Sequence, residues 1–424
     1  MKQTRGMGEV QVPEPVSEEI CRLGHKPSLL SFWRVLTLIG LTTAMLATQS
    51  IAFPQLSAKG YLAGKLISTT VDSALARYYL ETSLSLSEGG RENRLSSTER
   101  QLLDERIFET EQRFQWRALD WVTLRALSHQ TSPDFATLFF IKQTLSDGRN
   151  AKLQMAYAKE INLIKSGLQR SNRTAIVRDK LRHYHLLFVP GFHYRTDPTS
   201  GADFHSQRQW FRRLGLHAQL VASSEDGTVE ENAAIIAGAV RSESGANRRL
   251  ILISTSKGGP ETALALGKLL GSGETESVKA WLSVGGLIRG TFLADQVMGW
   301  PQSWLARIMF SASGNDPKSL PGLTTRASRA RMEGIRLPSH LFILQFVGAP
   351  LSGQVASDVK GRYVRLRKYG PNDGLTLLAD ELLPNGVTII EPGLDHFYRD
   401  PEIDLKSLAI ANIVADELEG HGRQ

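Results

Sequence analysis

The segment Leu250-Ile251-Leu252-Ile253-Ser254-Thr255-Ser256-Lys257-Gly258-Gly259 decides the fold class of this 424-residue chain. Its apolar run, residues 250–253, predicts a buried strand, and Pro260–Leu266 has the composition of a helix start. Between the two lies a turn of the form small residue-x-Ser-x-Gly, centred on Ser256. In a nucleophile elbow, small residues two before and two after the serine let the strand and helix backbones approach closely. The segment therefore predicts an elbow that presents the Ser256 hydroxyl above a sheet.

Short apolar runs and helical patterns alternate on both sides of this segment. The expected strands are 186–189, 218–221, 250–253, 280–284, 341–347 and 387–390. Helical patterns separate several of them, for example at 228–240 and 259–270. Such alternation predicts an α/β domain, with a mostly parallel sheet and helices on both of its faces. We expect this domain to cover residues 181–424.

Residues 54–180 have a different pattern, which predicts a helical module before the sheet domain. One amphipathic helix is expected to begin at Ser96 or Ser97 and to run to about Leu127. Two more are expected at 135–145 and 151–168, separated by the turn residues Ser146-Asp147-Gly148. No group of residues suited to catalysis occurs in this region, so we interpret it as a packing or cap module.

The first 53 residues predict a targeting or membrane-anchoring segment rather than a folded domain. Val35 to Ala58 carries no charge, and roughly 20 apolar residues suffice to cross a bilayer. Three basic residues precede the run: Arg22, Lys26 and Arg34. They favour a cytoplasmic N-terminus, while Ser50-Ile51-Ala52 offers the small residues of a signal-peptidase site. A cleaved signal peptide, an uncleaved membrane anchor and a buried core helix all fit. In both export interpretations the chain after about Phe53 lies outside the cytoplasmic membrane, in a bacterial periplasm.

The composition excludes several classes of protein. Hydrophobic residues make up 41% and charged residues 22%, as in a globular protein with an ordinary core. The excess of 50 Lys and Arg over 43 Asp and Glu is small and dispersed, so we expect no nucleic-acid partner. Cys21 is the single cysteine, which excludes an intrachain disulfide and gives no Cys/His metal-binding pattern. We expect neither a metal nor a cofactor, and the oligomeric state stays open.

A serine nucleophile needs a base, and the base needs an acid to orient it. In elbow-containing hydrolases the three follow in the order serine, acid, histidine. His396 lies in a loop after the strand expected at 387–390, and Asp373 lies in the preceding loop, 369–374. Of the other later histidines, His340 begins a strand and so lies at the wrong end of the sheet, and His421 lies in the tail. The predicted constellation is Ser256, Asp373 and His396.

The acid has three alternatives, which we rank below Asp373. Asp395 adjoins His396 and cannot readily orient it, Asp358 precedes the pattern at 363–366, and Asp380 lies on a helical stretch. An oxyanion intermediate also needs two backbone N–H donors, one just after the nucleophile and one after an early strand. The N–H of Lys257 meets the first condition. The N–H of Phe192, after Pro190-Gly191, is the expected second donor.

These residues together resemble the bacterial lipase and esterase branch of the α/β-hydrolase superfamily. The resemblance lies in residues 254–259, in Leu282–Asp295 and in Asn372-Asp373-Gly374, and it extends over about residues 185–410. Three positions depart from the usual pattern: Ser254 replaces a glycine, and Leu287-Ile288 replace Pro-His. The resemblance implies an α/β-hydrolase fold and hydrolysis of a carboxylic ester through an acyl-enzyme without a cofactor. It does not fix the substrate, which we expect to be a small-molecule or lipid ester.

Two questions stay open at the level of sequence. The segment at about 296–325 is rich in large apolar residues, including Trp300, Trp304 and Phe310, and fits either a lid over an acyl pocket or ordinary core packing. The fold also fits other functions. A catalytically inactive envelope scaffold or binding protein fits the same sequence, as does an acyltransferase or amidase with the same triad.

Overall fold

The computed structural model describes residues 55–82, 96–115, 117–167, 170–244, 248–299 and 317–421, and Pro54–Gln424 forms one compact unit. The predicted signal or anchor segment lies outside the described residues, except for its last residues. The central part of the predicted lid, 300–316, lies outside them too. Within the described ranges, no helix has both the length and the apolar character needed to cross a membrane.

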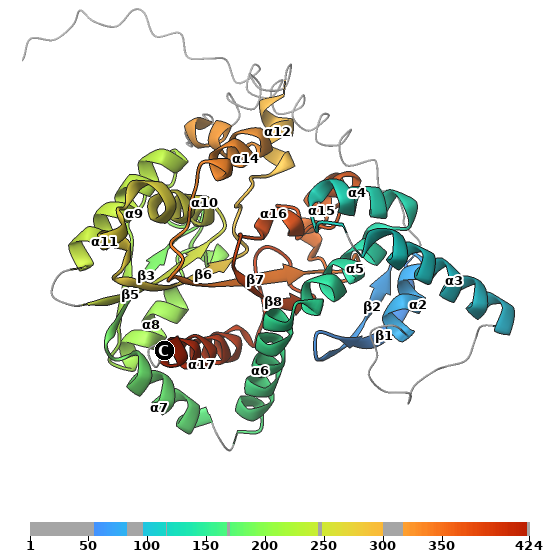
Figure 1. Cartoon of the computed structure of the whole chain (residues 1–424), viewed down its shortest axis with the longest axis horizontal. Helices are drawn as coiled ribbons and strands as arrows, with labels where there is room; N and C mark the ends of the chain where they lie inside the picture. The colour runs from blue at the N-terminus through green and yellow to red at the C-terminus, as the bar shows by residue number, and fades with distance from the viewer. Residues whose placement is uncertain are drawn as a thin grey trace, which may run out of the picture. The chain divides into compact units, whose positions relative to one another are not determined.

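A parallel sheet of six strands forms the centre of this unit (Figure 1). Its strands are β3 (Tyr184–Val189), β4 (His217–Leu220), β5 (Arg249–Thr255), β6 (Val278–Val284), β7 (Phe342–Ala349) and β8 (Val387–Pro392). Their order across the sheet is β4-β3-β5-β6-β7-β8, and every neighbouring pair is parallel. Each predicted strand is thus present within a few residues of its expected position.

Helices cover both faces of the sheet (Figure 1). One face packs against α6 (Gly148–Lys165), α7 (Arg170–Leu181), α8 (His205–Arg213) and α17 (Ile403–His421). The other packs against α9 (Val229–Glu243), α10 (Gly258–Leu264) and α14 (Thr325–Glu333). Along β5, Ile251 and Ile253 join the first core, and Leu250 and Leu252 join the second. The strand reads as a continuous apolar run because both of its faces are buried. The expected α/β architecture, a parallel sheet with helices on both faces, is confirmed.

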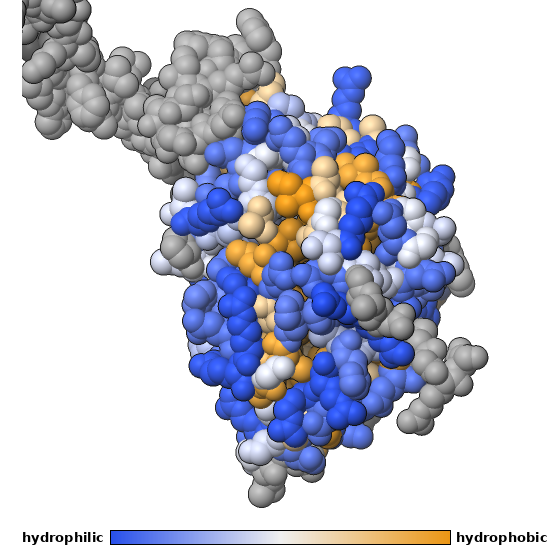
Figure 2. All heavy atoms as spheres, turned by 90° about the vertical axis from the view of Figure 1, so that its left-hand side faces the viewer, coloured by the Kyte–Doolittle hydropathy of each residue, from blue (hydrophilic) through white to orange (hydrophobic). Residues whose placement is uncertain are grey.

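Shorter elements complete this unit. They are a π-helical turn at Ala265–Leu269, the helices α11 (Ser272–Thr275), α12 (Phe292–Met298), α15 (Ser357–Leu366) and α16 (Leu378–Glu381), and 3-10 turns at Pro198–Ser200, Pro317–Ser319, Pro321–Leu323 and Arg367–Tyr369. On the face seen in Figure 2, apolar residues gather in narrow strips between charged and polar ones.

The N-terminal region begins with a β-hairpin, so its interpretation as entirely helical is wrong for residues 56–71. Strands β1 (Leu56–Leu62) and β2 (Lys65–Val71) pair antiparallel. Ala63 and Gly64 join them with φ of 52° and 82°, a two-residue turn of the kind that suits tight hairpins. The burial of β1 alternates because one face of the hairpin packs against a hydrophobic core and the other faces solvent. The sequence gives no clear signal for this turn, because Ala63 lies at a left-handed position where glycine or asparagine is usual.

Helices follow the hairpin: α2 (Ala74–Thr82), α3 (Ser97–Phe114), α4 (Trp121–Gln130) and α5 (Pro133–Ser146). Ser96 caps α3 through a reciprocal capping box with Glu99, which confirms the expected helix start. The helix ends at Phe114 rather than near Leu127, and Asp120 caps the next one. Asp147 caps α6, so the turn expected after Ser146 is also present.

Helix α6 seals one edge of the sheet. The side-chain amide of Gln154 accepts from the N–H of Ile390 at 2.9 Å and donates to its carbonyl at 3.0 Å. Asn150 Oδ1 accepts from the N–H of Thr388 at 2.8 Å. These amides satisfy backbone groups of β8 that an edge strand would otherwise expose. The N-terminal region is therefore built into the sheet domain rather than appended to it.

Candidate active site

Ser256 lies at the end of β5 with a left-handed backbone, φ +51°, which is unusual for a residue other than glycine. Close contacts hold it there. A Cβ added to Gly258 would lie 2.8 Å from the carbonyl oxygen of Pro190, and one added to Gly259 would lie 2.9 Å from Cα of Gly286. Only glycine lets β3, the elbow and the loop after β6 approach so closely. Sequence and packing thus agree on a sharp turn that presents the serine hydroxyl.

Ser254, which replaces the usual glycine, has a structural partner. Its Oγ accepts a hydrogen bond of 2.8 Å from the indole N–H of Trp281 on β6, and both side chains are fully buried. The serine is small enough for the elbow and also satisfies a buried donor that would otherwise be left unpaired. The departure from the pattern therefore leaves the elbow intact.

The structure brings Ser256, His396 and Asp373 together. His396 Nε2 lies 3.0 Å from Ser256 Oγ, and His396 Nδ1 lies 2.5 Å from Asp373 Oδ2. All three residues are buried. Because the serine and histidine are 140 positions apart, only the tertiary fold creates this contact. The chain of hydrogen bonds is the one that a serine nucleophile, a base and an orienting acid require.

The Asp373 carboxylate is held by its own turn. Its Oδ1 accepts from the N–H groups of Leu375 and Thr376 at 2.8 and 2.7 Å, which leaves Oδ2 to face the imidazole. The loop after β6 fixes this turn, because Thr376 Oγ1 donates to the Gly290 carbonyl at 2.8 Å. The segment that carries Leu287-Ile288 in place of the usual Pro-His thus supports the acid loop.

The alternative acids are occupied elsewhere. Asp395 Oδ2 accepts from the N–H of Ala356 at 3.1 Å, and Asp358 is exposed and paired with Arg399. Burial raises the pKa of Asp380 to about 6, and Arg329, at 2.9 Å, offsets part of the shift.

Glu381 is a further buried carboxyl group near the site, which the sequence reasoning missed. Neither of its oxygens has a hydrogen-bond partner among the described residues. Burial, with the charge of Asp373 as a smaller cause, holds the pKa of Glu381 well above its usual range. A buried carboxyl group without a partner favours its neutral form, because burial penalises the charge.

Tyr398 anchors the loop that carries His396. Its hydroxyl donates to the Phe346 carbonyl at 2.9 Å and accepts from the Gly348 N–H at 2.8 Å. Its ring lies so close to Gly285 that a Cβ there would be 2.8 Å from the ring. The backbone N–H of His396 also donates to the carbonyl of Asp373 at 2.9 Å. The position of the imidazole is therefore set by β7 and by the acid loop together.

The two predicted oxyanion donors lie on segments next to Ser256. A Cβ added to Gly191, which precedes Phe192, would be 3.2 Å from the Ser256 Cβ. The side chain of Lys257 turns inward, with Nζ 2.9 Å from the Glu225 carbonyl and 5.4 Å from the centre of the Phe192 ring. It thus ties the elbow to both neighbouring loops. The roles of the Phe192 and Lys257 N–H groups stay predictions.

Lys257 also forms a buried ion pair with Glu261, 3.4 Å away. Burial lowers the pKa of Lys257 and raises that of Glu261 to about 7, and the pairing of the two groups offsets part of each shift. Asn232 donates a further bond of 2.7 Å to Glu261. This polar cluster under the elbow carried no signal in the sequence beyond its i, i+4 spacing.

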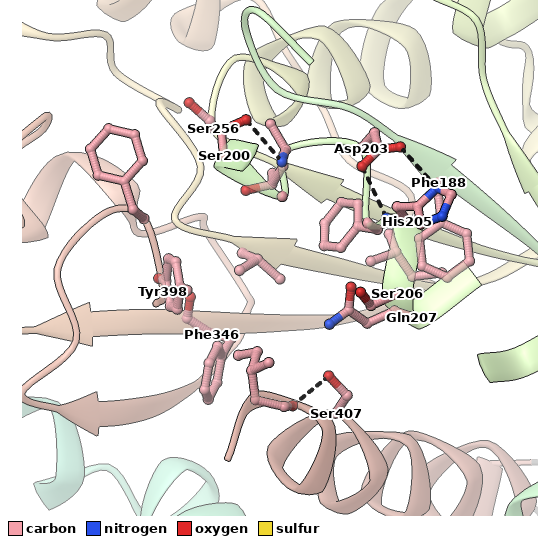
Figure 3. A pocket seen from close by; sticks show the side chains of 18 of the residues that line it. Phe188, Ser200, Asp203, His205, Ser206, Gln207, Ser256, Phe346, Tyr398 and Ser407 are labelled. Carbon is pink, nitrogen blue, oxygen red and sulfur yellow. Dashed lines mark hydrogen bonds and ion pairs between the residues drawn. The ribbon is translucent and has the colours of Figure 1, made fainter. Parts of the chain in front are cut away.

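A cavity of about 910 Å³ opens at Ser256 and His396. Figure 3 shows Ser256 on one side of it, Phe346 and Tyr398 on the second, Phe188 on the third and Ser407 of α17 opposite. The volume is at the upper end of the range of about 300–1,000 Å³ typical of ligand pockets. Phe192 and Phe397 also line it.

A possible metal-binding group lies at the other end of the sheet. Donor atoms of His185, His217 and Glu243 lie within 4.8 Å of one another. The two imidazoles are stacked 3.9 Å apart, and Glu243 accepts from both His185, at 3.0 Å, and Arg248, at 3.4 Å. Parallel stacked rings do not aim their nitrogens at one point, so the arrangement favours a hydrogen-bonded stack. The sequence reasoning missed this group because its members lie on three separate elements.

No protein-family model and no curated protein matches this sequence. Among solved structures, a metagenomic carboxyl esterase is similar over 56% of this chain and 76% of its own, with 23% identity and a TM-score of 0.47. A lipase of Staphylococcus hyicus is similar over 57% of this chain and 97% of its own, with 13% identity and a TM-score of 0.46. The mature form of a Bacillus licheniformis lipase covers 55% of this chain and 91% of its own, with 20% identity and a TM-score of 0.43.

Proposed function

We propose that this protein is a serine hydrolase that cleaves a carboxylic ester through an acyl-enzyme intermediate. The hydrogen-bonded chain from Ser256 through His396 to Asp373 carries the proposal, with separations of 3.0 and 2.5 Å. The position of Ser256 at a left-handed elbow beside a ligand-sized cavity adds support. The substrate is a small-molecule or lipid ester.

In the proposed reaction, Ser256 Oγ attacks the ester carbonyl while His396 Nε2 accepts the hydroxyl proton. The tetrahedral intermediate collapses, the bond to the alcohol breaks, and His396 gives the proton to the departing alcohol. Water, deprotonated by His396, then attacks the acyl-enzyme and releases the carboxylic acid with Ser256 restored. Asp373 holds the imidazole in the tautomer that has Nδ1 protonated and stabilises the imidazolium.

The negative charge that forms on the carbonyl oxygen needs donors that are already in place. The N–H groups of Lys257 and Phe192 fill that role in our proposal. Lys257 has a second, positioning role, because its side chain fastens the elbow to the Glu225 carbonyl and to the ring of Phe192.

A fluorophosphonate probe tests the nucleophile directly, because it reacts covalently with an activated serine. We expect the wild-type chain to be labelled and Ser256→Ala to be unlabelled. Thr255→Ala, one position away on the same turn, is the matched control and should be labelled. Equal labelling of wild type and Ser256→Ala, or of neither, contradicts the proposal and favours an inactive scaffold. Short-chain p-nitrophenyl esters then measure turnover.

We also propose that the enzyme domain is exported or anchored at the inner membrane, outside the cytoplasm. The support is the uncharged run Val35–Ala58 after basic residues. Fractionation of a bacterium that expresses the full chain, with mass spectrometry of the product, tests this. A membrane-bound full chain indicates an anchor, and a periplasmic chain that begins near Phe53 indicates cleavage. Full-length protein in the cytosol alone contradicts the proposal.

A further inference from the structure

The cavity at Ser256 does not end above the sheet, where the strands meet the elbow. It continues along one face of the sheet toward the opposite end, between the strands and α17. Its deep lining comes from β3 (Leu186 and Phe188), β5 (Ile251 and Ile253) and α17 (Ile410 and Ala411). These residues belong to the core on that face. The cavity is therefore a channel whose deep part is lined by residues of a hydrophobic core.

Three polar side chains in the deep part of the channel are already bonded within the protein. Ser407 Oγ donates to the Ile403 carbonyl at 2.8 Å, and the Tyr398 hydroxyl is bonded to two backbone groups. Lys406 Nζ is paired with Glu391 at 2.8 Å and with Asp400. Gln207 of α8 adds one amide to this lining, and the rest of the deep surface is mostly hydrocarbon. The part of a ligand that enters should therefore be mainly hydrocarbon.

Two independent measures give the length of the channel. On β5 the lining runs from Ile251 to Thr255, which spans about 13 Å at the rise of a strand. On α17 it runs from Ile403 to Val414, which spans about 16 Å at the rise of a helix. An extended hydrocarbon chain of roughly ten to thirteen carbons has this length.

We propose that this channel binds the acyl chain of the substrate, so that the enzyme acts on esters of unbranched acids of about ten to fourteen carbons. The inference rests on the proposed function. Protein cores are close-packed, and an apolar void of this size destabilises the fold unless a ligand fills it. The carbonyl must lie at Ser256, at the channel's mouth, so the acyl chain extends along the sheet face. The alcohol points to the solvent and can leave first.

Substitutions on helix α17 can test this, because they block the channel at different depths. The helix runs away from the site, so Ser407→Phe blocks the channel nearer to Ser256 than Ala411→Phe does. We expect Ser407→Phe to lower kcat/KM for a p-nitrophenyl dodecanoate, relative to the butanoate, by about 30-fold or more. Ala411→Phe should reduce the tetradecanoate most and leave the octanoate nearest to wild type. Ala234→Phe, the same substitution at an exposed position on the other face of the sheet, should keep every ratio.

Thermal unfolding verifies that each variant folds, and Ser407→Val and Ala411→Val provide milder obstructions with the same order of cut-offs. If folded variants hydrolyse all chain lengths in wild-type ratios, the channel proposal is overturned while the proposed function stands. Binding gives a readout without hydrolysis: by calorimetry, dodecanoate should bind Ser256→Ala and bind the Ser256→Ala/Ser407→Phe double variant at least tenfold more weakly. Such binding in a protein that neither labels nor hydrolyses esters would retain the channel and reject the hydrolase.

Discussion

Two buried clusters in this molecule contain carboxylates in hydrogen bonds, one at the candidate active site and one at a structural junction. At the candidate active site, Asp373 is bonded to His396, and His396 to Ser256, whose hydroxyl faces a cavity. At the junction of the N-terminal region with the sheet domain, Asp134 and Asp72 form the second cluster. We call it the junction cluster; it comprises Asp72, Asp134, Ser352, Tyr363 and Arg367.

The junction cluster binds three segments together. Asp134 accepts from the N–H of Asp72 at 2.8 Å, and from the N–H and hydroxyl of Ser352 at 2.8 and 2.6 Å. Asp72 pairs in turn with Arg367. The cavity at Ser256 does not reach these groups, since none of them is among its lining residues.

The comparison shows that a ligand's access to the cluster, rather than the type of side chain, distinguishes a reactive site from a structural one. Both clusters are buried and both hold ionisable groups in hydrogen bonds. In one, the serine at the end of the chain of bonds lies on a strained turn and opens to a ligand-sized cavity. In the other, the bonds join backbone and side chains of separate segments, which stabilises the fold. Stability and activity should therefore respond in opposite ways to substitution at the two places.

The largest expected effect is on activity at the first cluster. Ser256→Ala should lower kcat/KM for a p-nitrophenyl ester by at least about 10⁴-fold, because no other group attacks the carbonyl. Its free energy of unfolding in urea should stay within about 0.5 kcal/mol of wild type. A large loss of stability together with the loss of activity would show that this cluster is structural too.

The second effect is on stability at the junction cluster. Asp134→Ala leaves the donors of Asp72 and Ser352 buried without an acceptor, so we expect a loss of about 3 kcal/mol in the free energy of unfolding. Activity per folded molecule at low temperature should not change. Urea unfolding and active-site titration measure the two quantities. Thr137→Ala on the same helix is the matched control and should cost far less, because it removes a hydroxyl that, among the described residues, is bonded to the Pro133 carbonyl alone.

A smaller effect of the opposite sign is expected at the elbow. Ser256→Gly relieves the left-handed backbone at φ +51°, so the free energy of unfolding should rise by about 1 kcal/mol while activity is lost. Comparison with Ser256→Ala isolates the backbone strain, since both variants lack the hydroxyl. Equal stability of the glycine and alanine variants would show that the turn stores no strain.

The smallest effect is a pH dependence at the junction. Burial, and secondarily Asp72, raise the pKa of Asp134 to about 7, while bonds from Ser352 offset part of the rise. A carboxyl with a raised pKa contributes stability below its unfolded pKa of about 4, and this contribution is lost as the pH rises through about 7. Wild type should therefore lose more stability than Asp134→Asn between pH 5 and pH 8, as measured by urea unfolding. Parallel pH profiles would contradict this assignment.

Much of the fold could be predicted because local patterns determine local structure. The six strands are apolar runs, and the capped starts of α3 and α6 are visible as Ser96 with Glu99 and as Asp147. The hairpin at 56–71 escaped because its turn contains Ala63 at a left-handed position. The partners of Ser254 and Gln154, Trp281 and the edge of β8, are distant in sequence and carry no local signal.

The sequence by itself determined the elbow and the order of serine, acid and histidine. Steric demands on small residues around Ser256 are local, so they can be read from adjacent positions. The tertiary structure alone decided that His396 and Asp373 meet at Ser256, that the Glu381 carboxyl is buried without a hydrogen-bond partner among the described residues, and that a channel continues along one face of the sheet. Those properties depend on distances, burial and cavity volume between segments that are far apart in the sequence. Ser256 and His396, for example, are 140 positions apart, so no local pattern encodes their contact.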